Sequence, residues 1–258
     1  MKIKLLPSTF DSNGVPSDGQ HYTCFVIDDE VAIDAGSLAG SVTEKQRNLI
    51  RDVLLTHAHL DHIAGLPIFI DDLFSTLEEP IRIHARKEVI QTLEQHIFNW
   101  EIYPRFSELT NNFGSVMQYR EIGAQDDFEI KHLKIRSVDV NHNVISSGFL
   151  ISDERSTIAM TGDTSEMDNF WTLANSIENL SALLIECAFP DSLGELADIS
   201  HHMTPKRLMR ELEKFSNKVC PVYIINLKPI YRKTIAAEIA AINSNRLQIL
   251  EVGHEYFF

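Results

Sequence analysis

The chain has 258 residues, 44% of them hydrophobic, which is enough to bury one sizeable core. Its formal net charge of −14 at pH 7 repels polyanions and argues against long nucleic acids as partners. The three cysteines are too few and too scattered for a disulfide framework, and no early apolar run is long enough for a signal peptide or membrane helix. We therefore expect a cytoplasmic protein that does not engage membranes.

The first part of the chain predicts short strands joined by tight turns. Apolar runs at 3–6, 22–27 and 31–34 are separated by Asp-Asp and Asp-Ala-Gly sequences, which is typical of a strand meander. A polar helix is expected at about 43–50. The apolar run at 53–56 has the composition of a buried strand, which would deliver the residues after it to a sheet edge.

The middle of the chain mixes helices and strands. A helix is expected from about 60 to 74, a strand at 81–85, and a further helix where Val89, Leu93 and Ile97 recur at helical spacing. Strand patterns return from about 116 to 162.

The second half ends in two alternations of strand and helix. The runs ALLIEC and VYII predict strands, and 204–214 and 231–242 predict helices, the first with Thr204 as its cap and Pro205 in its first turn. Strands followed by helices, twice over, indicate an α/β fold with two sheets packed between helix layers. We expect one domain over residues 1–258; two domains divided near residue 115 are the alternative.

Four potential metal ligands lie within six residues in THAHLDHIAG: His57, His59, Asp61 and His62. They follow a predicted strand and precede a predicted helix, so one turn can aim several of them at one point. Imidazole nitrogens and carboxylate oxygens are the usual ligands of catalytic zinc. Burying three histidines and an aspartate without a partner would be costly, which favours a metal site over a chance cluster.

The sequence THAHLDHIAGLP resembles a motif of the class II cyclic nucleotide phosphodiesterases of the metallo-β-lactamase superfamily. HNVISSGFLI at 142–151 and MTGDTS at 160–165 are similar to later motifs of that family, as are LLIECAFPDS, HHMTPKRL and VYIINLKP. These motifs span residues 57–229 in the family's order. The resemblance implies a four-layer αββα sandwich and hydrolysis of 3′,5′-cyclic nucleotides, such as cyclic AMP or cyclic GMP, to nucleoside 5′-monophosphates.

The resemblance also assigns ligands to two divalent metal ions. It places the first ion at His57, His59 and His142 and the second at Asp61 and His62, with Asp163 bridging the two. Zinc is the metal we expect, with manganese or iron as alternatives.

One position departs from the family pattern. Asn226 stands where the family has a histidine before the Lys-Pro pair, so the second metal site includes a weaker ligand. Three interpretations remain open: a naturally loosened site, an engineered substitution that disables it, or a switch to a harder cation that tolerates an amide oxygen.

The catalytic residues implied by the resemblance are Asp61, in addition to its metal-binding role, and His202. His202 in HHMTP is the candidate acid for the leaving 3′ oxygen, because related metallo-phosphodiesterases carry a histidine in a matching His-x-Thr sequence. His201 is its rival, and Glu186 could support the acid. For either histidine, a capping or surface role is the alternative. Lys228 could contact a phosphate or stay solvated.

Two further classes of function stay open. A broader phosphodiesterase or a tRNA 3′-end nuclease would share the histidine motif, although the acidic charge and the lack of a basic arm argue against the nuclease. A weakened, metal-bound nucleotide-binding protein would explain Asn226. For the leading prediction the expected partner is a small cyclic nucleotide, and a homodimer is possible.

Overall fold

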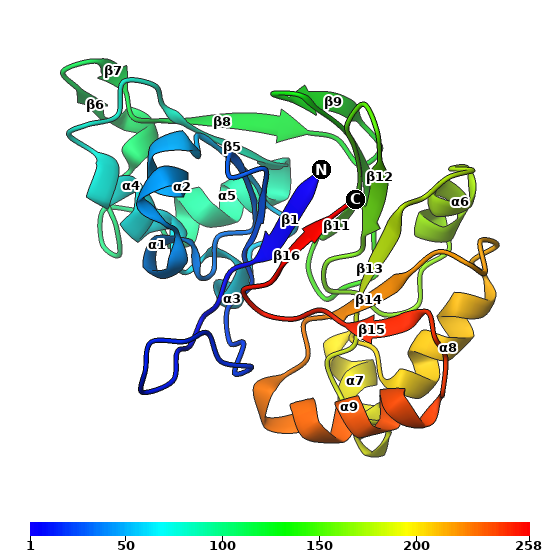
Figure 1. The fold of residues 1–258 in the computed structure, drawn as a ribbon. Helices are drawn as coiled ribbons and strands as arrows, with labels where there is room; N and C mark the ends of the chain where they lie inside the picture. The colour runs from blue at the N-terminus through cyan, green and yellow to red at the C-terminus, as the bar shows by residue number, and fades with distance from the viewer.

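Two seven-stranded sheets lie face to face in the computed structural model, which describes residues 1–258 (Figure 1). The first has the strand order β16 (Glu255–Phe257), β1 (Lys2–Leu5), β2 (Phe25–Ile27), β3 (Val31–Ile33), β4 (Asp52–Leu54), β5 (Ile81–Arg86), β8 (Met117–Ile122). The second has the order β15 (Leu247–Ile249), β14 (Val222–Ile225), β13 (Ala182–Glu186), β12 (Thr157–Met160), β11 (Ser147–Ser152), β10 (Leu133–Asp139), β9 (Asp127–Ile130). A small hairpin joins β6 (Thr110–Asn111) and β7 (Gly114–Ser115).

Each sheet begins as an antiparallel meander and continues with parallel strands. In the first sheet β1, β2 and β3 are antiparallel and β3, β4, β5 and β8 are parallel. In the second sheet β9 to β12 are antiparallel and β12 to β15 are parallel. Parallel neighbours require crossover connections, which here are mostly helices. This is the repeated order of strands and helices that the sequence predicts.

Helices cover the outer face of each sheet (Figure 1). Those of the first half are α1 (Leu38–Ser41), α2 (Glu44–Leu49), α3 (Leu60–Ile63), α4 (Leu66–Leu73) and α5 (Lys87–His96). Those of the second half are α6 (Asn169–Asn175), α7 (Gly194–Ser200), α8 (Pro205–Glu213) and α9 (Arg232–Ala241). Single 3-10 turns lie at Phe106–Glu108, Asp191–Leu193 and Pro229–Tyr231. None of the helices is long and apolar enough to cross a lipid bilayer.

Three apolar layers separate these four layers of secondary structure. One lies between the sheets and contains Phe25 and Phe149, both fully buried. The others lie between each sheet and its helices and include Phe69 on one side and Phe215 on the other. Burial of such layers is the main favourable term in folding. The predicted four-layer αββα sandwich is therefore confirmed.

The predicted helix at 60–74 is wrong as a continuous element, since it is divided into α3 and α4. Pro67 lies in the first turn of α4 and has no N–H with which to continue a helical ladder from α3. Gly65 lies between the helices against the carbonyl of Ala35, which a Cβ atom there would approach to 2.6 Å. The break therefore turns the chain directly after the histidine run.

Two other predictions need correction in detail. The strand predicted at 22–27 begins only at Phe25, because the N–H of Thr23 donates to the carbonyl of Asp61 instead of a neighbouring strand. Thr204 occupies the N-cap position of α8, ahead of Pro205, but its side chain makes no capping hydrogen bond.

Candidate metal centre

The predicted site residues lie far apart in the sequence but gather at one edge of the two sheets. The histidine run follows β4, His142 lies between β10 and β11, Asp163 follows β12 and Asn226 follows β14. Because β12, β13 and β14 are parallel, the residues that follow them emerge at the same sheet edge. Ligand sites of α/β sheets occur at such carboxyl ends of strands.

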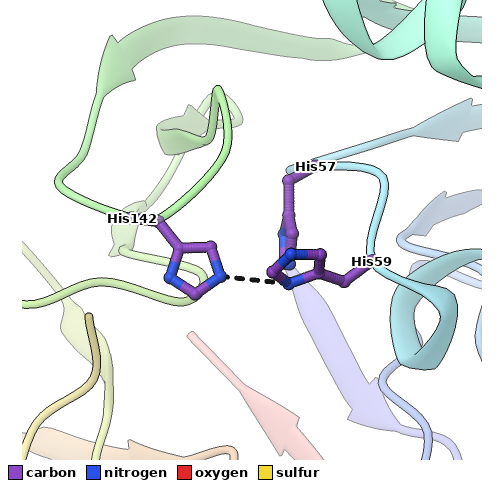
Figure 2. A group of neighbouring side chains, drawn as sticks. All are labelled: His57, His59 and His142. Carbon is purple, nitrogen blue, oxygen red and sulfur yellow. Dashed lines mark hydrogen bonds between the residues drawn. The ribbon is translucent and has the colours of Figure 1, made fainter. Parts of the chain in front are cut away.

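His57, His59 and His142 form the first group of candidate ligands. Their rings converge (Figure 2), and one nitrogen from each lies within 4.8 Å of the others. Nδ1 of His59 and Nε2 of His142 are 3.1 Å apart. Two nitrogens bound to one tetrahedral zinc ion at about 2.0 Å would be separated by roughly 3.3 Å, so the spacing suits a shared ion.

Hydrogen bonds fix the orientation of two of these rings. Nδ1 of His57 lies 2.9 Å from the hydroxyl of Thr56, which itself donates to Asp34. Nδ1 of His142 donates to the carbonyl of His201 at 3.1 Å. In both rings Nε2 is left with its lone pair toward the site, and Nε2 of His57 is buried without any hydrogen-bond partner. A buried acceptor without a partner is costly, and a metal ion would satisfy it.

The protonation states also suit a metal. Burial lowers the pKa of His57, His59 and His142, in the last case to about 4, so these imidazoles are neutral at pH 7. Burial favours the neutral acid at Asp163, but the charge and hydrogen bond of His62 outweigh it and hold the pKa of that carboxyl well below its usual range. The four groups therefore present three lone pairs and one negative charge, which fits a divalent cation.

His62 belongs to a second group with His57 and Asp163. Its Nδ1 donates to Oδ2 of Asp34 at 2.7 Å, and its Nε2 lies 3.4 Å from Oδ2 of Asp163. Burial opposes a positive charge on His62, but Asp163 and Asp34 raise its pKa well above the usual value. A proton on Nε2 and a metal ion beside it are thus alternative ways to satisfy Asp163.

Asp34 is a site residue that the sequence analysis missed. It is 1% exposed and accepts hydrogen bonds from the N–H and the hydroxyl of Thr56 as well as from His62. It therefore orients one candidate ligand directly and His57 through Thr56. The available signal was an aspartate placed directly after the apolar run of β3, at the start of an Asp-Ala-Gly turn.

Asp61 is not brought into any of the three groups of converging ligand atoms. Its Oδ2 lies 3.4 Å from Nζ of Lys228, and both side chains are partly exposed. They face a cavity of about 180 Å³ whose lining also includes His62, Asp163 and Asn226.

Asn226 presents its amide nitrogen, not its oxygen, to Asp163. Nδ2 of Asn226 donates to Oδ1 of Asp163 at 2.5 Å, and Oδ1 of Asn226 accepts from the hydroxyl of Thr23 at 3.3 Å. An amide N–H is not a metal ligand, so only the amide oxygen could serve, and that atom faces Thr23.

His202 lies beside the first group, in a third cluster with His142 and Asp163. Its Nδ1 donates to Oε1 of Glu186 at 2.8 Å, and Glu186 is fully buried at the end of β13. Burial opposes charge on His202, but Glu186 raises its pKa above the usual value. His201, the rival candidate, is directed elsewhere: its Nδ1 lies 3.0 Å from the side-chain oxygen of Asn141.

His84 and the three cysteines lie outside the groups of converging ligand atoms. Nε2 of His84 is 2.8 Å from Oδ1 of Asp52. All three cysteines are buried and free, and burial raises the pKa of the Cys187 thiol well above its usual value. A thiol held protonated in this way is a poor nucleophile.

Comparison with known proteins places these residues in a wider context. Residues 34–221 match the family described as Beta-lactamase superfamily domain. The matched range begins at Asp34 and includes every candidate ligand except Asn226.

Individual proteins are similar to this chain in sequence or in fold. The chain is 27% identical over 233 residues to a probable 3′,5′-cyclic-nucleotide phosphodiesterase from Yersinia pestis, covering 79% of this chain and 66% of that protein. The fold is similar to unliganded yeast PDE1, with a TM-score of 0.79 and 16% identity over 100% of this chain and 99% of that one. It is also similar to human tRNase Z, short form, with a TM-score of 0.65 and 16% identity over 100% and 99%. At such identities the structural matches show the fold alone.

Proposed function

The chain belongs to the β-lactamase superfamily, and from this premise we propose that it is a metal-dependent phosphodiesterase that converts 3′,5′-cyclic nucleotides to nucleoside 5′-monophosphates. The similarity to a protein named as a cyclic-nucleotide phosphodiesterase, over 79% of this chain, supports the substrate class. This chain spans 66% of the length of that relative, so the relative's activity is only a proposal for this chain.

One observation carries the proposal: a set of neutral imidazoles and an ionised carboxylate converges beside a histidine that is bonded to a buried glutamate. The first part suits a metal ion, and the second suits a proton donor. Hydrolysis of a cyclic nucleotide is favoured by both, because charge develops on the phosphoryl oxygens and the leaving 3′ oxygen gains a proton.

We propose that His57, His59, His142 and Asp163 hold a divalent ion, with zinc favoured by the ligand types. Such an ion, when bound, lowers the pKa of a water molecule and neutralises charge on phosphoryl oxygens. Neutral imidazoles leave the charge of an ion largely uncompensated, whereas Asp163 adds one negative charge to anchor it.

His202 supplies the proton in this proposal. Its Nδ1–H is committed to Glu186, which leaves Nε2 on the side of His142 and Asp163. With Glu186 favouring the protonated ring, Nε2–H can donate to the 3′ oxygen as the bond between phosphorus and that oxygen breaks. Glu186 holds the ring in place through its hydrogen bond with Nδ1.

The test is an assay with 3′,5′-cyclic AMP and cyclic GMP, with added zinc or manganese and a chelated control. Formation of the 5′-monophosphate that disappears on chelation supports the proposal. A tRNA precursor, offered in parallel, tests the nuclease alternative, against which the net charge of −14 argues. Nucleotide binding without turnover under every metal condition would instead favour a binding protein and sink the enzyme proposal.

A further inference from the structure

We propose that this chain holds one tightly bound metal ion, because Asn226 presents an amide donor where a second ion would need a ligand, and Lys228 pairs with the carboxylate of Asp61. The inference deepens the proposed function, on which its consequences for substrate binding rest. The second candidate site lacks a ligand that a second ion requires, because Asn226 presents its amide N–H to Asp163.

The first step concerns Asp163. A carboxylate can bridge two ions through one oxygen or through both. Oδ2 of Asp163 faces the imidazoles, 3.4 Å from Nε2 of His62 and 4.0 Å from Nε2 of His57, but Oδ1 accepts the hydrogen bond from the amide of Asn226. A second ion at Oδ1 would have to compete with this amide donor.

The second step concerns the orientation of Asn226. Its Oδ1 accepts from the hydroxyl of Thr23, and turning the amide over would replace the hydrogen bond to Asp163 with two oxygen atoms that face each other. The backbone of Asn226 is in the left-handed region, at a φ of 57°, which asparagine tolerates better than most residues. The residue is thus suited to its place as a donor to Asp163.

The third step concerns Asp61, the other carboxylate expected to bind a second ion. It belongs to none of the converging ligand groups, and Nζ of Lys228 lies 3.4 Å from its Oδ2. Both residues line the same 180 Å³ cavity as Asp163 and Asn226. The Lys228 ammonium group therefore neutralises the carboxylate of Asp61.

Lys228 brings a positive charge to a cavity that Asp61 and Asp163 also line. A phosphodiester carries one negative charge, so Lys228 is assigned as a binding residue for a phosphoryl oxygen, displaced from Asp61 when the substrate enters.

The experiment counts ions in the absence of substrate. The apo chain is loaded with excess zinc, and in parallel with manganese, then dialysed, and its bound metal is measured by mass spectrometry and by calorimetric titration. We expect about one ion per chain for the natural sequence and about two for the double variant Asn226→His, Lys228→Met. Histidine is acceptable at this backbone conformation and adds the missing imidazole. Lys233→Met, an exposed lysine of α9, is the matched control and should keep one ion.

The natural chain alone can overturn the inference: two ions bound with comparable affinity would contradict it whatever the variants do. A folded double variant that still binds only one ion would contradict it as well. In turnover, Lys228→Met should raise KM about tenfold or more, with its metal content unchanged. Absence of turnover in a chain with one ion would count against the proposed function and leave the ion count intact, so the two failures are distinguishable.

Discussion

Asp34 and His62 form a buried pair in which Nδ1 of His62 donates to Oδ2 of Asp34 over 2.7 Å. The same carboxylate accepts from Thr56, whose hydroxyl contacts Nδ1 of His57. One residue thus sets the ring orientation of two candidate ligands from behind the site. Carboxylates that hold metal-bound histidines in this way raise the basicity of the ring as well as fixing its tautomer.

Replacing Asp34 with asparagine should therefore weaken metal binding without removing a ligand. We expect the metal affinity to fall by about 10- to 100-fold, the usual effect of losing such a supporting group. A competition titration against a chelator dye measures this, and Asp72→Asn, on the exposed face of α4, serves as control. An unchanged affinity in a folded Asp34 variant would show that the rings are held by packing alone.

Gly36 is required by the close approach of two loops. A Cβ atom at Gly36 would lie 1.9 Å from the carbonyl oxygen of Asp61 and 2.9 Å from the N–H nitrogen of Thr23. We expect Gly36→Ala to displace the histidine run, to cost about 1 to 3 kcal/mol of unfolding free energy and to weaken metal binding at least tenfold.

Gly40→Ala provides the matched control for this substitution. Gly40 lies in α1, and a Cβ atom there would meet nothing within 4 Å. Alanine should stabilise this helix by about 0.5 to 1 kcal/mol. Urea unfolding of both variants, with metal titration, checks the contrast, and equal behaviour of the two would refute the steric argument.

The sequence predicts the features of this protein that depend on neighbouring residues better than those that depend on contacts between distant segments. The cluster at His57, His59 and His62 is local, and the strand before it could be recognised from its apolar composition. The convergence of His142 and Asp163 on that cluster followed only from the resemblance, because no local pattern shows which loops meet at a sheet edge.

The remaining features were hidden because they are made by long-range contacts. Asp34 contacts His62 across 28 positions, and Lys228 contacts Asp61 across 167. The spacing of apolar residues predicted one continuous helix over 60–74. Such spacing does not show the break that Gly65 and Pro67 impose. The orientation of the Asn226 amide depends on hydrogen bonds from two other segments, which a residue type alone does not predict.

Asp52 gives a prediction for stability away from the site. Its side chain is 4% exposed and accepts two hydrogen bonds of 2.7 Å from Arg82 and one of 2.8 Å from His84. Burial would raise the pKa of Asp52, but these donors outweigh it and hold the pKa well below its ordinary value of 3.8. The Arg82 side chain is 24% exposed, so its charge stays partly solvated when the carboxylate is removed, and Asp52→Asn should lose about 1 to 3 kcal/mol at pH 7.

The sign of the pH dependence follows from the lowered pKa. Because folding lowers the pKa of Asp52, its stabilisation is complete above the ordinary pKa and is lost as the pH falls below it. The difference in unfolding free energy between the natural chain and Asp52→Asn should therefore be constant from pH 7 to pH 5 and shrink below about pH 4. Asp127→Asn, which breaks an exposed pair with Arg136, should change stability by about 0.5 kcal/mol or less. A difference that grows on acidification would contradict this account.

The role of His202 can be separated from that of the metal ligands by changing the leaving group. If His202 protonates the 3′ oxygen, His202→Asn should lower kcat for cyclic AMP by about 10²- to 10⁴-fold while metal content stays unchanged. A p-nitrophenyl phosphodiester releases a stabilised anion that needs no proton, so its hydrolysis should fall far less in the same variant.

Glu186→Gln should follow the same pattern with a smaller loss, since it acts only through the His202 ring. Glu213→Gln, on the exposed side of α8, is the control. An equal loss for both substrates would mean that His202 supports the structure of the site or the metal, because a group that only donates a proton to the leaving oxygen cannot slow a reaction in which that oxygen needs none.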